Sequence, residues 1–285
     1  MEIKFKNVTA DYELGPIRSP LVLKSVNLLL KEGSFTAVIG RTGAGKSTLL
    51  KTINGLLLPT EGEIKVGENV IRQNNEKRTL KNVRKKVGMV FQFPEQQLFA
   101  QTVEKDICFG PMNHGATLQE AQEKAREVIH LVGLPPEILN QSPHTLSGGQ
   151  KRRVAIAGVI AMEPDILVLD EPGAGLDPVG KTEIMEMIKS FHDQKKWTTI
   201  LVTHDMNDVV RYAEDVVVME QGQVVKHDRV RNVFSDITNV QKWDLDLPEA
   251  YQFQVKLEAQ TGIQLPHACL TVEELAETLM EVGLV

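Results

Sequence analysis

One feature constrains this chain more than any other: a strand that runs directly into a glycine-rich loop and then into a helix. Residues Ser34–Ile39 are mostly apolar or β-branched and predict a buried strand. The segment from Lys46 onward predicts a helix. The loop between them fits the pattern G-x-x-x-x-G-K-[ST], with the residues Gly40, Arg41, Thr42, Gly43, Ala44, Gly45, Lys46 and Ser47.

This pattern has a physical reason in phosphate binding. Glycines let backbone N–H groups curl around phosphates, and the start of the following helix favours an anion. Lys46 would reach the β- and γ-phosphates and Ser47 would ligate Mg²⁺, with Thr48 beside it. The alternative is a chance glycine-rich turn. Because the loop lies between a strand and a helix, as the binding mechanism requires, the sequence predicts a site for ATP and Mg²⁺.

Two further segments offer groups for the same chemistry. The run Leu146–Gln150 precedes a helix, so Ser147, Gly148, Gly149 and Gln150 offer a second phosphate-binding helix start. The run Ile166–Leu169 predicts a buried strand that ends in Asp170 and Glu171. Asp170 would hold Mg²⁺ through water, and Glu171 would orient or deprotonate the attacking water. Taken alone, each segment also fits an ordinary helix cap or a pair of solvated acids.

In order along the chain, these motifs resemble the ATP-binding cassette family over about residues 1–235. The resemblance adds Gln92, Asp177 and His204 to the phosphate loop and the two later motifs. It implies that Gln92 lies near Mg²⁺ and the membrane partner, that Asp177 communicates across a dimer, and that His204 contacts the γ-phosphate. Tyr12 stands where family members place an aromatic ring under adenine, although an ordinary surface tyrosine is the alternative. Gly173 departs from the family, which often has Thr or Ser there.

A narrower resemblance rests on Phe91–Phe99 and on the Phe-Gly-Pro-x-Asn run that starts at Phe109. These segments resemble the ATPases of energy-coupling factor (ECF) transporters, the second ATPase subunit of the vitamin group in particular. The resemblance implies a heterodimer with a paralogous ATPase, a transmembrane T component and substrate-binding S components. A related branch that imports cobalt or nickel is the alternative.

The bulk composition agrees with a soluble subunit at the cytoplasmic face of the membrane. The formal net charge is −6, so the overall charge gives no basic footprint of a nucleic-acid-binding protein. We see no signal peptide, and the longest apolar run, Val154–Met162, is far below the ~20 residues of a membrane span. Membrane association is therefore expected through partners only. The two cysteines, Cys108 and Cys269, lack metal-ligand spacing and are expected to be free thiols.

Alternating strands and helices predict an α/β fold with a mainly parallel sheet. The resemblance to the ATP-binding cassette family implies that this fold is a phosphate-loop ATPase with a RecA-like core. A helical subdomain is expected at about 102–162, where Thr117 and Glu120 predict a capping box. We expect the cassette to span residues 1–235 and a small helical extension to span 236–285. Thr271 and Glu274 predict a second capping box there, and Leu275 and Leu279 predict one apolar face. That face would either contact a second chain or pack on its own cassette.

Two other classes of protein compete with a transporter ATPase. Soluble ABC proteins of DNA repair or translation carry long coiled coils or tandem cassettes, and this chain has neither. A phosphate-loop kinase for a small substrate would leave Leu146–Gln150 unexplained.

The aromatic run Phe91–Phe99 suggests where a membrane partner docks. Phe91 is expected in the core, because it ends a predicted strand. Some of Phe93, Leu98 and Phe99 are expected to line an exposed groove, because they cannot all continue that strand. Glu95 is expected to pair with a basic residue on a helix of the T component.

Overall fold

The computed structural model describes residues 1–14, 17–18 and 22–284, and its centre is a six-stranded sheet. The strand order is β12 (Gln223–Arg229), β11 (Asp215–Glu220), β5 (Phe35–Ile39), β10 (Thr198–Val202), β9 (Ile166–Asp170) and β8 (Val87–Val90). All neighbours pair in parallel except β11 and β12. Every residue of β5, β8, β9 and β10 is buried, as expected for strands covered on both faces.

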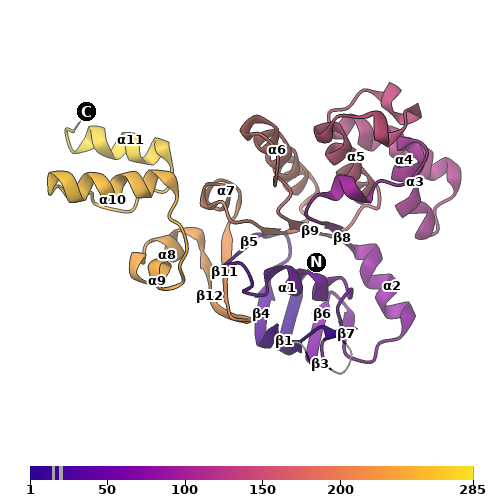
Figure 1. Ribbon diagram of the computed structural model, residues 1–285, viewed down its shortest axis with the longest axis horizontal. Coiled ribbons are helices and arrows are strands. Elements are labelled where there is room, and N and C mark those ends of the chain that lie inside the picture. The colour runs from indigo at the N-terminus through magenta and orange to yellow at the C-terminus, as the bar shows by residue number, and fades with distance from the viewer. Residues whose placement is uncertain (15–16, 19–21, 285) are drawn as a thin grey trace.

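A second, antiparallel sheet lies beside the first (Figure 1). Its order is β4 (Leu23–Leu30), β1 (Ile3–Ala10), β6 (Glu61–Val66) and β7 (Asn69–Ile71). A two-stranded hairpin, β2 (Glu13–Leu14) and β3 (Ile17–Arg18), follows β1. The helix α1 (Lys46–Ile53) packs between the two sheets, and its residues Leu49, Leu50 and Ile53 belong to the core that both sheets share. The phosphate-loop segment is thereby held by two sheets at once.

Four helices and a short 3₁₀ turn surround this core. They are α2 (Lys77–Lys86), η1 (Pro94–Gln97), α6 (Pro178–Lys195), α7 (Met206–Tyr212) and α8 (Val230–Phe234). The helix α6 begins after Asp177, whose carboxylate accepts a hydrogen bond from the Gly180 N–H at 2.7 Å. The helix α7 begins after Asp205 in the same manner. Both helices therefore start at carboxylates that close loops of the candidate site.

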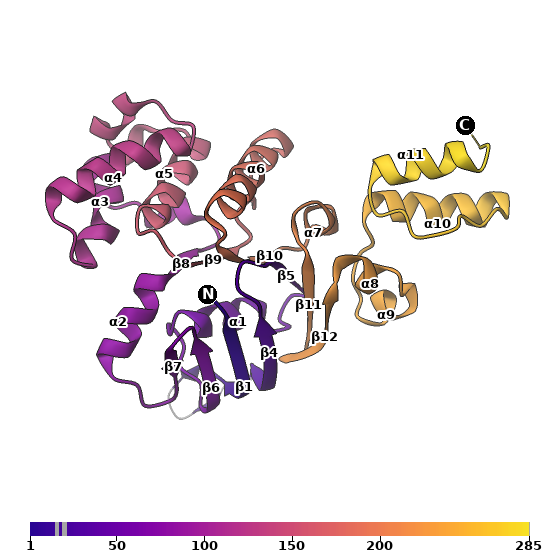
Figure 2. The same ribbon diagram turned by 180° about the vertical axis from the view of Figure 1, so that it is seen from behind.

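The segment expected to form a helical subdomain contains α3 (Val103–Asn113), α4 (Leu118–Leu131) and α5 (Gly148–Ile160), with η2 (Pro136–Asn140) and η3 (Pro143–Thr145) between α4 and α5. The three helices lie side by side in both views (Figures 1 and 2). The predicted capping box of Thr117 and Glu120 is present at the start of α4. Buried Ala121, Ala125 and Val128 form the apolar face of α4.

The C-terminal segment contains α9 (Ile237–Lys242), α10 (Glu249–Thr261) and α11 (Val272–Glu281). Leu275 is buried and Leu279 packs against the same cluster, which includes Ala250 of α10. The predicted apolar face of α11 therefore packs within its own chain. The second capping box is only half formed: Thr271 caps the helix, but the Glu274 carboxylate accepts a hydrogen bond from the Leu270 N–H and not from Thr271.

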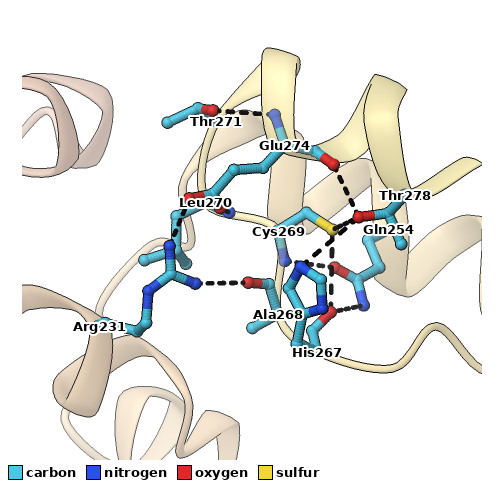
Figure 3. Close-up of polar contacts among 9 residues, drawn as sticks. All are labelled: Arg231, Gln254, His267, Ala268, Cys269, Leu270, Thr271, Glu274 and Thr278. Atoms are coloured by element: carbon cyan, nitrogen blue, oxygen red, sulfur yellow. Dashed lines mark hydrogen bonds and ion pairs between the residues drawn. The ribbon is translucent and has the colours of Figure 1, made fainter.

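A network of polar contacts joins this segment to the cassette (Figure 3). Arg231 of α8 pairs with the Glu274 carboxylate of α11 and donates a 3.4 Å hydrogen bond to the Ala268 carbonyl. The buried Gln254 side chain donates to the His267 carbonyl and accepts from the Cys269 N–H at 2.8 Å. Because Gln254 uses both ends of its amide, it fixes the loop between α10 and α11.

Apolar packing joins the same two parts. Trp243 and Tyr251 belong to one buried cluster with Val216 and Val218 of the central sheet, and Phe234 is fully buried among them. The C-terminal helices are thus anchored to the sheet through a shared core.

We expect Phe234→Ala to lower the free energy of unfolding by about 3–5 kcal/mol, because it leaves a cavity in that shared core. The matched change Phe253→Ala removes a ring that is 54% exposed on α10, and it should cost less than about 0.5 kcal/mol. Urea unfolding of both variants measures the difference. Equal losses in the two variants would contradict the anchoring role of Phe234.

Candidate active site

The phosphate loop joins β5 to α1, and its glycines are required by the backbone. Gly40 has φ +145°, and a Cβ there would lie 2.2 Å from the Met219 carbonyl oxygen of β11. Gly43 and Gly45 also have positive φ, at +83° and +100°. Residues with a side chain disfavour this region of backbone conformation. Glycine is therefore favoured at all three positions, where the loop turns tightly over the end of the central sheet.

Lys46 folds back across this loop. Its ammonium donates hydrogen bonds to the carbonyls of Gly40, at 2.7 Å, and Arg41, at 3.0 Å. Burial lowers the pKa of Lys46, and the nearby carboxylates Glu171 and Asp170 work in the opposite direction. The cation is thereby held at the mouth of the loop, where an anion would meet it.

Asp170 and Ser47 supply oxygen atoms next to Lys46. Asp170 ends β9 and is only 8% exposed. Burial raises the pKa of Asp170 above its ordinary value, while Ser47 and the lysines nearby partly offset that rise. A buried carboxylate and a hydroxyl at one edge form an oxygen donor set that a hard cation such as Mg²⁺ prefers. Among the described residues, no group of three or more His, Cys, Asp or Glu could hold a metal ion by itself.

Glu171 lies at the centre of a second cluster. Its two carboxylate oxygens contact Gln92 Nε2 at 3.1 Å and His204 Nδ1 at 3.3 Å. The backbone of Glu171 has φ +49°, which is rare for a residue with a side chain and often marks a functional site. The Glu171 N–H donates to the Val202 carbonyl of β10 at 3.0 Å, which fixes this turn. The structure thus brings together three residues that are far apart in the sequence.

Tyr12 lies beside the start of α1. Its hydroxyl is 3.4 Å from the Thr48 hydroxyl, and the Lys51 ammonium is 5.4 Å from its ring centre. The ring is half-buried next to the phosphate loop. This position is adjacent to the predicted nucleotide site.

The segment Ser147–Gln150 starts α5 in the helical subdomain, apart from α1 in both views (Figures 1 and 2). Ser147 and Gln150 form a capping box, in which each side chain accepts a hydrogen bond from the other residue's N–H. Ser147 and Gly148 are exposed, and a Cβ at either Gly148 or Gly149 would meet nothing within 4 Å. The single chain therefore does not bring this segment to the phosphate loop.

Glu95 does not serve as a free partner for an incoming helix, so that expectation is wrong. Its carboxylate forms a bidentate pair with Arg152 of α5, with N–O distances of 2.8 Å and 3.0 Å. Arg152 is buried and also donates to the carbonyls of Pro172 and Ala174. Arg152 carries no local signal in the sequence, yet it ties α5 to the loop after Gln92 and to the loop after Glu171. A buried arginine needs such partners, and among the described residues Glu95 is the only carboxylate that pairs with Arg152.

The expected groove near Phe91–Phe99 does exist. A largely apolar hollow of about 270 Å³ lies between the end of β8, η1, α3 and α5. Phe99 and Phe109 meet edge to face on its rim, 62% and 51% exposed. Leu98 lines the groove but packs partly into the core of the helical subdomain. Phe91 is half-buried against the core that both sheets share.

Comparison with known proteins identifies this arrangement. A family model described as ABC transporter matches residues 23–174. The energy-coupling factor transporter ATP-binding protein EcfA2 of Geobacillus kaustophilus is 50% identical over 284 residues, which cover 99% of this chain and 97% of the relative. The chain belongs to the ABC transporter family, in its group of energy-coupling factor ATP-binding proteins. EcfA2 of Bacillus licheniformis is 52% identical over 276 residues, or 97% of this chain and 96% of the relative.

Solved ABC structures agree with this assignment. The structure of cbiO1 from Clostridium perfringens, described as part of the ABC transporter complex cbiONQ, has a TM-score of 0.74 and 32% identity and covers 92% of this chain and 98% of its own. A dimeric post-hydrolysis state of the ATP-binding cassette MJ0796, bound to ADP and Pi, has a TM-score of 0.71 and 32% identity over 80% of this chain and 99% of its own. The predicted fold class and the resemblance to ABC and ECF ATPases are therefore confirmed.

We expect Gly40→Ala to destabilise the nucleotide-free ABC protein by at least about 2 kcal/mol, because both the backbone conformation and the Met219 carbonyl oppose a side chain. Gly43→Ala is the matched control, since its Cβ would meet nothing within 4 Å. Gly43→Ala should lower the free energy of unfolding by only about 1 kcal/mol, because alanine is strained at a positive φ. Urea unfolding without nucleotide measures both changes. A smaller loss in Gly40→Ala than in Gly43→Ala would contradict the role of the Met219 contact.

Proposed function

We propose that this chain binds ATP with Mg²⁺ and hydrolyses it in an ECF-type importer that takes up vitamins or similar micronutrients. It is an ABC ATPase, a subunit of an energy-coupling factor transporter. The observation that carries the proposed mechanism is the contact of the Glu171 carboxylate with both Gln92 and His204, beside the phosphate loop. The solute is selected on another chain, so the same chemistry would also serve an importer of cobalt or nickel.

The candidate site residues would have separate roles in nucleotide binding and in hydrolysis. Backbone N–H groups of Gly40–Ser47 would bind the phosphates, Lys46 would pair with the β- and γ-phosphates, and Tyr12 would stack under adenine. The Glu171 carboxylate would accept a proton from the attacking water, while His204 would contact the γ-phosphate. Because Gln92 and His204 both contact Glu171, they would orient its carboxylate before the water arrives.

The Mg²⁺ would be held by Ser47 and Gln92 directly and by Asp170 through water, and it would neutralise charge on the phosphates. The donor set fits, because the buried Asp170 carboxylate has a raised pKa that a nearby cation would lower. The remaining ligands would be phosphate oxygens and water, which agrees with the absence of a complete carboxylate cage among the described residues.

A second ATPase chain would complete the site. Ser147–Gln150 of one chain would meet the phosphate loop of the other, head to tail. Two glycines support this proposal. Neither Gly148 nor Gly149 has a positive φ, and a Cβ at either position would meet nothing within 4 Å among the described residues, so the fold itself does not require glycine there. A backbone without side chains would instead let a group from another molecule approach closely. The MJ0796 cassette is dimeric in its state with ADP and Pi. In this chain we propose that the partner is a paralogous ATPase subunit.

A transmembrane T component would dock in the groove beside η1, with substrate-binding S components joined to it. Within residues 1–14, 17–18 and 22–284, no helix combines the length and the apolar character of a membrane span. Work on a solute would therefore pass through a protein contact at the cytoplasmic face of the membrane. The exposed Phe99 and Phe109 supply apolar surface for that contact, and Gln92, which contacts Glu171, directly precedes the segment that leads to this groove.

We expect Glu171→Gln to lower the kcat of ATP hydrolysis by about 10²–10⁴-fold, because the amide keeps the polarity but cannot accept the proton. Nucleotide affinity should remain near that of the unchanged protein. Lys46→Ala should instead weaken nucleotide affinity itself. Steady-state hydrolysis and equilibrium binding separate the two effects. Near-normal turnover in Glu171→Gln would refute the assignment of the base.

The groove is tested best at Phe99. Phe99→Ser should reduce recovery of membrane subunits with the chain and reduce solute uptake, because it removes exposed apolar surface at the docking site. Binding of ATP by the isolated chain should not change. The matched control is Phe253→Ser, which alters a similarly exposed ring on α10, away from the groove. Normal assembly and uptake with Phe99→Ser would place the membrane contact elsewhere. Glu95 is unsuitable for this test, because changing it would also leave the buried Arg152 without its carboxylate.

A further inference from the structure

Lys181 connects two loops that border the candidate active site. It lies in the first turns of α6, and its ammonium pairs with the carboxylate of Asp205 and, at 2.8 Å, with that of Asp208. Burial alone would lower the pKa of Lys181, but its hydrogen bonds to these two carboxylates raise it above the ordinary value. The ammonium is thus charged and shared between two residues at the start of α7.

The stem of Lys181 occupies the space that a side chain at position 173 would need. A Cβ on Gly173 would lie 2.7 Å from Lys181 Cγ and 3.4 Å from Cδ. These atoms lie near the root of the side chain, so they cannot swing aside without moving the ammonium. Gly173 itself does not have a positive φ. Glycine at 173 is therefore explained by the lysine and not by the backbone.

The ion pair between Lys181 and Asp205 also constrains His204, the residue before Asp205. Asp205 follows His204 directly, and its N–H donates to the Thr203 hydroxyl at 3.0 Å. One oxygen of Asp205 accepts the Asn207 N–H at 2.8 Å and caps α7, while the other faces Lys181. Since Thr203 is buried, His204 is a short exposed link between two fixed residues. Lys181, Asp205 and His204 also line one cavity of about 380 Å³ with Glu171 and Gln92.

We propose that Lys181 is a positioning residue for ATP hydrolysis: it holds the start of α7 so that His204 meets Glu171, and Gly173 leaves room for it. This proposal rests on the role assigned to His204 above. A carboxylate that both caps a helix and binds a fixed cation has little freedom, so the adjacent His204 backbone is confined as well. Without the cation, Asp205 and Asp208 would repel each other at the start of α7. His204 would then move away from Glu171.

The test measures steady-state hydrolysis by the full-length chain in the presence of a saturating concentration of its partner ATPase subunit. Lys181→Ala should lower kcat by about tenfold, less than the ~10²-fold that a misplacement of about 1 Å can cost. The KM for Mg-ATP should remain within about twofold, because the phosphate loop is unchanged. Lys181→Arg should restore most of the kcat, since a guanidinium also reaches two carboxylates. Lys189→Ala is the matched control: it removes an ion pair with Asp193 on the same helix, away from the site.

A double-mutant cycle tests the link to Gly173. Gly173→Ala alone should also lower kcat, because it displaces the lysine stem. The double variant Gly173→Ala/Lys181→Ala should be no slower than Lys181→Ala, because the clash and the ion pair are lost together. If the two losses instead multiply, Gly173 does not act through Lys181 and the proposal fails. Urea unfolding shows whether each variant folds. If Lys181→Ala does not fold, the kcat of Gly173→Ala tests the proposal instead.

A second cycle separates this inference from the proposed function. In a His204→Ala background, Lys181→Ala should have no further effect on the residual kcat, measured over long incubations. A merely structural lysine would lower kcat equally in both backgrounds, which would overturn the proposal. Normal kcat in Lys181→Ala with defective His204→Ala would refute the lysine's role alone. Normal hydrolysis by His204→Ala would instead refute the role of the histidine in the proposed function.

Discussion

The parallel pairing of β8, β9, β10 and β5 positions most of the candidate site. In this sheet Val38 pairs with Val202, and Val202 pairs with Asp170, so three strands end at the same level. Candidate site residues follow the end of each strand: the phosphate loop follows β5, Glu171 follows β9 and His204 follows β10. Because every residue of these strands is buried, a shift in register would move several functional groups together and disrupt the core.

Two cations, Arg152 and Lys181, connect the loops that follow these strands. Arg152 joins α5 to the segments that follow Gln92 and Glu171, and Lys181 joins α6 to the start of α7. Each cation is satisfied by more than one oxygen, so neither is left unpaired in a partly buried position. Such links let a rearrangement at one loop reach the next, and Arg152 joins α5, which lines the apolar groove, to the loop after Glu171.

Much of this architecture followed from sequence. The strand, glycine-rich loop and helix predicted the phosphate site because that motif is local: its backbone conformation depends on Gly40, Gly43 and Gly45 themselves. The capping box of Thr117 and Glu120 was predictable for the same reason. The ion pair of Glu95 could not be predicted, because its partner Arg152 lies far along the chain and nothing in either local sequence links the two residues. Gly173 was visible as a departure from the family, but its reason, the Lys181 stem, required the packing of α6.

Local sequence patterns established which chemical groups this protein carries: a phosphate loop, two acids at a strand end, a histidine after another strand, and helices in the C-terminal segment. These features depend on short-range periodicity, turns and caps, which neighbouring residues control. Which of these groups contact one another depends on the fold. It placed Gln92 and His204 on Glu171, turned Glu95 inward to Arg152, and buried Leu275 of α11 within its own chain. Those outcomes depend on long-range packing and on the need to pair buried charge, which no short stretch of sequence specifies.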